Sequence, residues 1–111
     1  MPVDYEAEYE KLSGEVFATL ASTPKRGYIP ASDGVYFKRA LVERALEAGR
    51  RALAENENLE MLRLARAMLL HMIGRSTEAE IDAEFLVARG GEVAKAARVL
   101  RKQIRASRNA I

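Results

Sequence analysis

The spacing of apolar side chains in the first part of the chain predicts a helix followed by a long loop. Over residues 4–22 apolar residues recur every three or four positions, and Asp4 stands where a side-chain oxygen can cap the first free amides. A Ser-Thr-Pro run at 22–24 breaks that spacing. One more proline and two glycines follow by residue 34, so we expect residues 24–33 to form a loop between the first and second helices.

Two further helices are predicted from the same periodicity. The second begins near Ser32 or Asp33 and ends near Ala54, with a broad apolar face. The third follows Asn58, which can cap it, and extends to about Ile73 with apolar residues on nearly every side. We therefore expect the third helix to be the buried centre of the protein.

Glycines and a capping pattern mark the last two helices. Gly74 suits the left-handed residue that closes a helix, and Thr77 with Glu80 fits a capping box that starts a helix over residues 78–89. Two glycines at 90–91 end that helix. The fifth helix carries an apolar stripe at Val93, Ala97, Leu100 and Ile104.

These patterns predict an all-α protein without strands, because no segment alternates apolar and polar residues for long enough to favour one. A length of 111 residues is typical of one domain, so we expect residues 1–111 to form a single all-helical domain, a compact antiparallel bundle of about five helices.

The turn between the third and fourth helices resembles that of a tetratricopeptide repeat. Gly74 is followed five residues later by Ala79, and Ala67 occupies the small position of the repeat's first helix. At an offset of 34 residues the repeat's Ala, Ala and Leu positions fall on Ala45, Ala52 and Leu100. The resemblance implies a tetratricopeptide-like helical hairpin. The repeat's aromatic positions fall on Arg63 and Ala83, so a generic antiparallel bundle stays the favoured architecture.

Two other helical resemblances fail at diagnostic residues. His71 lies on a predicted helix, as in histidine phosphotransfer domains, but no Lys follows it and Gly74 ends the helix. The segment 68–84 resembles a helix-turn-helix, but Arg75 follows the turn glycine where that motif has an apolar residue. Its second helix also carries four acids, which would repel a phosphate backbone.

The composition excludes several kinds of chemical site. The chain has no Cys and one His, so it has no disulfide, no thiolate nucleophile and no multi-histidine metal site. We interpret the acids in the fourth helix as stabilising its positive end; they are Glu78, Glu80, Asp82 and Glu84. Because no catalytic motif is recognisable either, we expect no enzymatic activity, no cofactor, no metal and no small-molecule substrate.

The formal charge is +2, but its distribution along the chain is uneven. Residues 1–23 contain five acids and one base, and residues 89–111 contain one acid and seven bases. The basic side chains of the fifth helix could contact the phosphates of a nucleic acid or pair with the acidic first helix. They are Lys95, Arg98, Arg101, Lys102, Arg105 and Arg108.

By elimination, we expect a noncatalytic protein–protein interaction module: a small adaptor, chaperone or regulatory subunit that binds another protein, or itself as a homodimer, through a helical surface. Tyr28 and Ile29 in the loop are candidate partner-binding residues, and they could equally fold back onto the end of the bundle. The alternative is a DNA-binding regulator that uses the basic C-terminal helix. With no basic leader and no apolar run of about 18 residues, we expect a cytoplasmic protein without a membrane partner.

Overall fold

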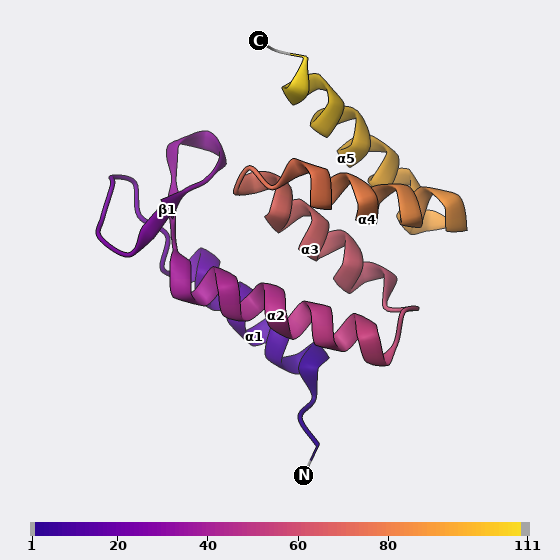
Figure 1. Ribbon diagram of the computed structural model, residues 1–111, viewed down its shortest axis with the longest axis horizontal. Coiled ribbons are helices and arrows are strands. Elements are labelled where there is room, and N and C mark those ends of the chain that lie inside the picture. Colours follow the sequence, from indigo (N-terminus) through magenta and orange to yellow (C-terminus); the bar gives the residue numbers. More distant parts are fainter. Residues whose placement is uncertain (1, 110–111) are drawn as a thin grey trace. The chain divides into compact units, whose positions relative to one another are not determined.

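The structure is a computed structural model that describes residues 2–109, and it confirms the all-α class (Figure 1). Five α-helices hold most of the described residues, and the strands among them form one two-stranded hairpin. The chain divides into two compact units, residues 1–59 and 60–111. That the whole chain forms one domain stays a prediction.

The first unit consists of two antiparallel helices with a short β-hairpin between them in sequence. Its elements are α1 (Tyr5–Ala18), β1 (Tyr28–Pro30), β2 (Tyr36–Lys38) and α2 (Arg39–Glu55). Tyr9, Leu12 and Val16 are buried along α1, which packs against α2. Phe37 of β2 is fully buried, and its ring meets that of Phe17 edge-on with centroids 5.2 Å apart.

The first helix begins as predicted and ends earlier. The Asp4 carboxylate accepts a hydrogen bond from the Ala7 amide at 3.1 Å, which confirms the N-cap. The helix stops at Ala18 rather than near residue 22. The reason is that Ala21 pairs with Tyr36 instead, through N–H···O bonds of 2.9 and 2.8 Å in the two directions.

The predicted absence of strands is wrong, because the loop residues form the first strand and part of the turn of a hairpin. Asp33 and Gly34 have positive φ angles of 64° and 73°, as residues in tight hairpin turns often do. They lie in a short 3₁₀ segment, Ser32–Gly34, which reverses the chain so that β1 and β2 pair antiparallel. As a result α2 begins at Arg39, not near residue 32, and it ends at Glu55, close to the predicted boundary.

The second unit contains α3 (Glu60–Met72), α4 (Ser76–Arg89) and α5 (Glu92–Arg108). Within this unit α4 packs against both of the other helices, and Ala79 and Ala83, both fully buried, let them approach closely. The expected burial of α3 on nearly every side is wrong at Met61 and Met68, which are 69% and 50% exposed. The buried apolar residues of α3 are Leu62, Leu64, Ala67, Leu69 and Leu70.

Glycine closes α3 as predicted, but the capping box does not form. Gly74 has φ of 85°, its amide donates to the His71 carbonyl, and the Arg75 amide donates to the Leu70 carbonyl, which together make a Schellman motif. The His71 imidazole Nδ1 lies 3.1 Å from the Ser76 hydroxyl across this turn. The Glu80 carboxylate binds arginines of α5 instead of capping α4.

Gly90 and Gly91, with φ of 76° and 84°, join α4 to α5. Both values lie in the left-handed region, which glycine adopts at little cost. None of the helices within residues 2–109 combines the length and apolarity needed to cross a bilayer.

Candidate functional site

The hairpin holds the two predicted partner-binding residues in half-buried positions. Tyr28 and Ile29 are consecutive on β1, so their side chains point to opposite faces of the ribbon. The Tyr28 ring has the Lys25 ammonium 5.5 Å from its centroid, and Ile29 is paired with Phe37. The two residues therefore do not form a joint exposed surface.

The six predicted cations of α5 fall into two groups. Arg105 reaches Glu80 at 3.1 Å and Glu84 at 2.8 Å, and Arg108 reaches Glu80 at 2.6 Å. Lys95 contacts Glu92 of its own helix at 3.2 Å. The other three cations have no ion pair among residues 2–109; they are Arg98, Arg101 and Lys102.

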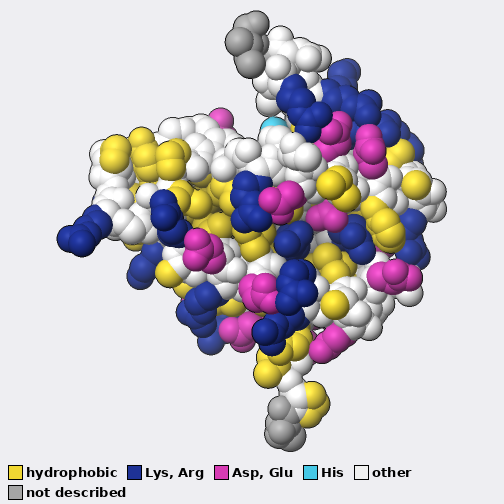
Figure 2. Space-filling view, viewed as in Figure 1, with side chains coloured by type: hydrophobic (Ala, Val, Ile, Leu, Met, Phe, Trp, Pro, Cys, Tyr) yellow, Lys and Arg dark blue, Asp and Glu magenta, His cyan; other side chains and the backbone are white. Residues whose placement is uncertain are grey.

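Within the second unit, the acids that pair with these cations come from α4 and from α5 itself. In Figure 2 the Lys and Arg side chains over α5 lie beside Asp and Glu side chains. The hydrogen bond from Arg105, followed by that from Arg108, holds the pKa of Glu80 below its usual value.

All four acids of α4 bind arginine, so stabilising the positive end of the helix is not their only role. The Asp82 carboxylate is buried, with Arg63 at 3.1 Å and Arg66 at 3.4 Å, both on α3. The Arg63 guanidinium also lies 3.9 Å from the centroid of the Phe85 ring. Glu78 binds Arg75 locally at 2.8 Å. Within residues 2–109 no group of three or more His, Asp and Glu side chains is placed to hold a metal ion.

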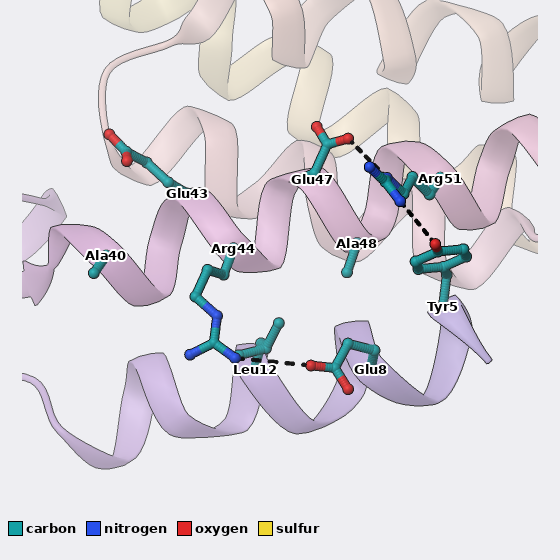
Figure 3. Close-up of a pocket in the computed structure, with 9 residues that line it drawn as sticks. All are labelled: Tyr5, Glu8, Leu12, Ala40, Glu43, Arg44, Glu47, Ala48 and Arg51. Atoms are coloured by element: carbon teal, nitrogen blue, oxygen red, sulfur yellow. Dashed lines mark hydrogen bonds and ion pairs between the residues drawn. The ribbon is translucent and has the colours of Figure 1, made fainter. Parts of the chain in front are cut away.

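The first unit contains a pocket of about 460 Å³ between α1 and α2, shown in Figure 3. Its lining combines an apolar part with charged side chains; the residues are Tyr5, Glu8, Leu12, Ala40, Glu43, Arg44, Glu47, Ala48 and Arg51. One Arg44 nitrogen lies 4.0 Å from a Glu8 oxygen, so an ion pair links the two helices across the pocket.

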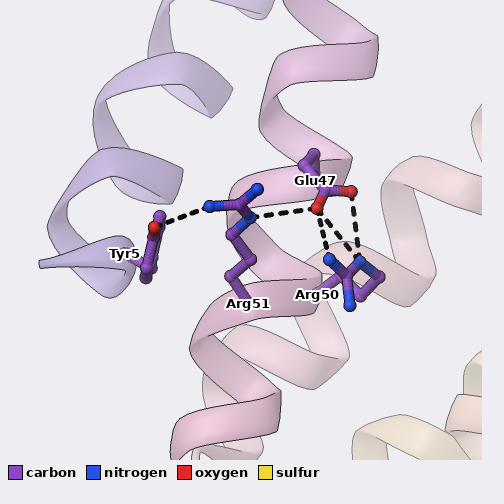
Figure 4. Close-up of polar contacts among 4 residues, drawn as sticks. All are labelled: Tyr5, Glu47, Arg50 and Arg51. Carbon is purple, nitrogen blue, oxygen red and sulfur yellow. Dashed lines mark hydrogen bonds and ion pairs between the residues drawn. The ribbon is translucent and has the colours of Figure 1, made fainter. Parts of the chain in front are cut away.

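A second link across the same pocket runs from Tyr5 to Glu47 (Figure 4). Arg51 donates to the Tyr5 hydroxyl at 2.7 Å and to the Glu47 carboxylate at 3.1 Å, and Arg50 donates to Glu47 as well. The hydrogen bonds from Arg50 and then Arg51 lower the pKa of Glu47 to about 2. The bond to Tyr5, with that to Glu47, raises the pKa of Arg51. A carboxylate held ionised in this way is unsuited to general acid chemistry at neutral pH.

The second unit contains an apolar groove of about 300 Å³ between α3 and α5, which we call the α3–α5 groove. It is lined by Leu64, Met68, Ala96, Val99, Leu100 and Gln103. Leu64 and Leu100 are 8% and 5% exposed and form its floor, whereas Met68 and Val99 are 50% and 58% exposed and form its walls.

Sequence reasoning missed this groove, although two features of the sequence indicate it. Met61 and Met68 lie seven residues apart on a helix that is apolar nearly all round, so they share one face. Val99 lies outside the stripe that was predicted to be buried on the fifth helix. Met61, Met68 and Val99 are thus apolar side chains that their helices do not use for packing within the unit.

Comparisons of the chain with models of protein families, with curated proteins and with solved structures gave no match. Its function is therefore inferred from the surfaces of the two units.

Proposed function

We propose that the chain is a noncatalytic protein–protein interaction module whose α3–α5 groove receives apolar side chains of a partner. The observation that carries the proposal is that Met68 and Val99 are half exposed above a buried leucine floor. Covering apolar surface releases free energy at about 25 cal/mol per Å². The flexible Met side chain adapts to differently shaped ligands, which is why methionine is common at binding surfaces.

The charged side chains of the larger α1–α2 pocket support a noncatalytic role. Glu8 with Arg44, and Glu47 with Arg51, neutralise one another, and Tyr5 accepts a hydrogen bond from Arg51. These groups bridge the two helices rather than converge on a vacant reaction centre. We expect the module to act in the cytoplasm and without a membrane partner.

The charge arrangement on α5 favours a protein partner over the alternative, a DNA-binding regulator. Arg105 and Arg108 already bind carboxylates, and Glu84 is half exposed beside them, where it would repel a phosphate. If only Arg98, Arg101 and Lys102 contact phosphates, the logarithm of affinity would fall with that of salt concentration with a slope of only about −2.7.

The experiment that tests the proposal compares two apolar-to-acidic variants of the second unit within the full chain. Val99→Asp places a charge on the wall of the α3–α5 groove. Ile81→Asp does the same on α4, where Ile81 is 65% exposed and does not line the groove. Affinity capture with mass spectrometry is run with both variants and with the original chain, after circular dichroism has shown that all three are folded.

We expect at least one protein to be captured by the original chain and by Ile81→Asp but not by Val99→Asp. If the captured species is a second copy of this chain, sedimentation will show a dimer that Val99→Asp dissociates. The proposal is wrong if no binding depends on Val99. It is also wrong if the original chain shifts duplex DNA and reversing Arg98, Arg101 and Lys102 abolishes that shift.

A further inference from the structure

We infer that the occupant of the α3–α5 groove is an amphipathic helix of a partner protein, with acidic side chains along one edge of its apolar stripe. The inference rests on the proposed function and specifies the chemistry of the ligand. Three observations support it: the length of the apolar walls, the helical nature of both walls, and the confinement of charge to one of them.

The mostly apolar lining of the groove extends over one helical turn on α3 and two on α5. On α3 the lining residues are Leu64 and Met68, and the exposed Met61 and Ala65 continue the same helix face beyond the lining. On α5 the lining residues Ala96, Val99 and Gln103 follow one another at spacings of three and four. Seven residues of helix span about 10 Å, which matches a ligand helix with apolar side chains at positions i, i+3 or i+4, and i+7.

A helical ligand fits these walls better than an extended one. Both walls are α-helices whose backbone groups are bonded within their own helix, so they offer no row of free N–H and C=O groups to an added strand. A helix satisfies its own backbone and needs only side-chain contacts. Ridges of side chains on the ligand can then pack into the groove between α3 and α5.

The net charge beside the groove is positive and lies on the α5 side, where Lys95 and Lys102 outnumber Glu92. Lys95 and Lys102 stand four residues before and three residues after Val99, on the same exposed face of the helix. Lys102 has no ion pair within the part of the chain that the structure describes, and the ammonium of Lys95 meets only the exposed Glu92 of its own helix. The second unit holds ten Lys and Arg against six Asp and Glu.

The α3 side has no such charge, because its lining residues are Leu64 and Met68 and the exposed residues that continue this face are Met61 and Ala65. The ligand should therefore be acidic on the side that faces α5 and uncharged on the side that faces α3. Lys95 and Lys102 are about 10 Å apart along the axis, so carboxylates seven residues apart on the ligand would meet both.

The test uses two fluorescent synthetic helical peptides with the same stripe of leucines on an alanine background. They differ only at two positions, seven residues apart on one edge of the stripe, which are both Glu or both Lys. Binding to the full chain is measured by fluorescence anisotropy at low and at high salt. The protein variants are Val99→Asp, Lys102→Glu and, as a matched control, Lys11→Glu, which changes an exposed lysine of α1.

We expect the Glu peptide to bind about tenfold more tightly than the Lys peptide at low salt, because two exposed attractions replace two repulsions. That preference should shrink at high salt, where exposed charges are screened. Lys102→Glu should reduce or invert it, Lys11→Glu should leave it unchanged, and Val99→Asp should weaken both peptides.

Other results separate the inference from the proposed function. If both peptides bind equally, Val99→Asp weakens both and Lys102→Glu has no effect, the acidic specificity is wrong and the proposed function stands. If neither peptide binds but a captured protein still depends on Val99, the helical ligand is wrong. If peptide binding is indifferent to Val99→Asp, the groove is not the binding site and both conclusions fail. A dimer of the chain that both groove variants dissociate would make the occupant a second copy and overturn the inference.

Discussion

Reversing the charge of Arg105 tests whether α4 and α5 are held together electrostatically. The guanidinium binds Glu80 through Nε and Glu84 through Nη2, at 3.1 and 2.8 Å. In Arg105→Glu two attractions become two repulsions across the same helix pair. Arg98 lies two turns earlier on α5, is exposed, and has no ion pair among the described residues, so Arg98→Glu is a matched control.

The expected magnitude follows from the exposure of the partners. The side chains of Arg105 and Glu84 are 52% and 51% exposed, so solvent screens this pair, while Glu80 is only 16% exposed. An exposed ion pair contributes about 0 to 1 kcal/mol, so losing two costs about 1 kcal/mol, and the new repulsion adds a similar amount. We therefore expect Arg105→Glu to lower the free energy of unfolding by about 2 kcal/mol and Arg98→Glu by less than about 0.5 kcal/mol.

The free energies of unfolding are measured by urea titration followed by circular dichroism, at low salt and again near 0.5 M salt, where screening should remove much of the difference. Adding Glu84→Arg to Arg105→Glu restores one attraction and should recover about half of the loss, a coupling that only a direct pair produces. Equal costs for Arg98→Glu and Arg105→Glu, or a cost that neither salt nor Glu84→Arg reduces, would refute the pairing as a source of stability.

Three further predictions concern the cores and the ionised groups. Leu86→Ala removes a side chain that is 1% exposed and should lower the free energy of unfolding by about 2 to 5 kcal/mol in urea titration. Met61→Ala, at a position that is 69% exposed, should lower it by less than about 1 kcal/mol. Similar costs would mean that the Met61 face of α3 is buried. Asp82→Asn removes the buried carboxylate that the part-buried Arg63 and Arg66 bind and should cost about 2 kcal/mol. A cost below about 1 kcal/mol would contradict a structural role for these ion pairs. Since the pKa of Glu47 is lowered from 4.5 to about 2, its contribution to stability is complete above pH 4.5 and is lost as the pH falls towards 2. Glu47→Gln should therefore flatten the decline of the melting temperature between pH 4.5 and 2. An unchanged decline would show that Glu47 titrates normally.

Features decided by a few neighbouring residues could be predicted from the sequence. The Asp4 cap and the closing glycines Gly74 and Gly90 depend on local backbone chemistry, and all three are where the sequence indicates. The hairpin was missed although Asp33-Gly34 is a typical type I′ turn sequence. Its strands are three residues long, which is too short for an alternating pattern, and Asp33 is equally suited to start a helix.

Features set by packing between helices could not be predicted. The sequence identifies six cations on the fifth helix, but only the placement of α4 against α5 decides that Glu80 neutralises Arg105 and Arg108 and leaves Lys102 unpaired among the described residues. Likewise, an apolar helix gives no indication of which face will lack a neighbour. In this unit Met68 and Val99 stay open because α4 lies against both α3 and α5 on another side.

The hairpin of the first unit also determines how this chain meets other chains edge to edge. β2 has β1 on one side and Ala21 on the other, so the open edge of the sheet belongs to β1. That edge is three residues long and ends in Pro30, which has no N–H to donate. A neighbouring strand would find too few backbone partners there to extend the sheet, so the molecule is protected at this point from the strand-by-strand assembly that leads to fibres.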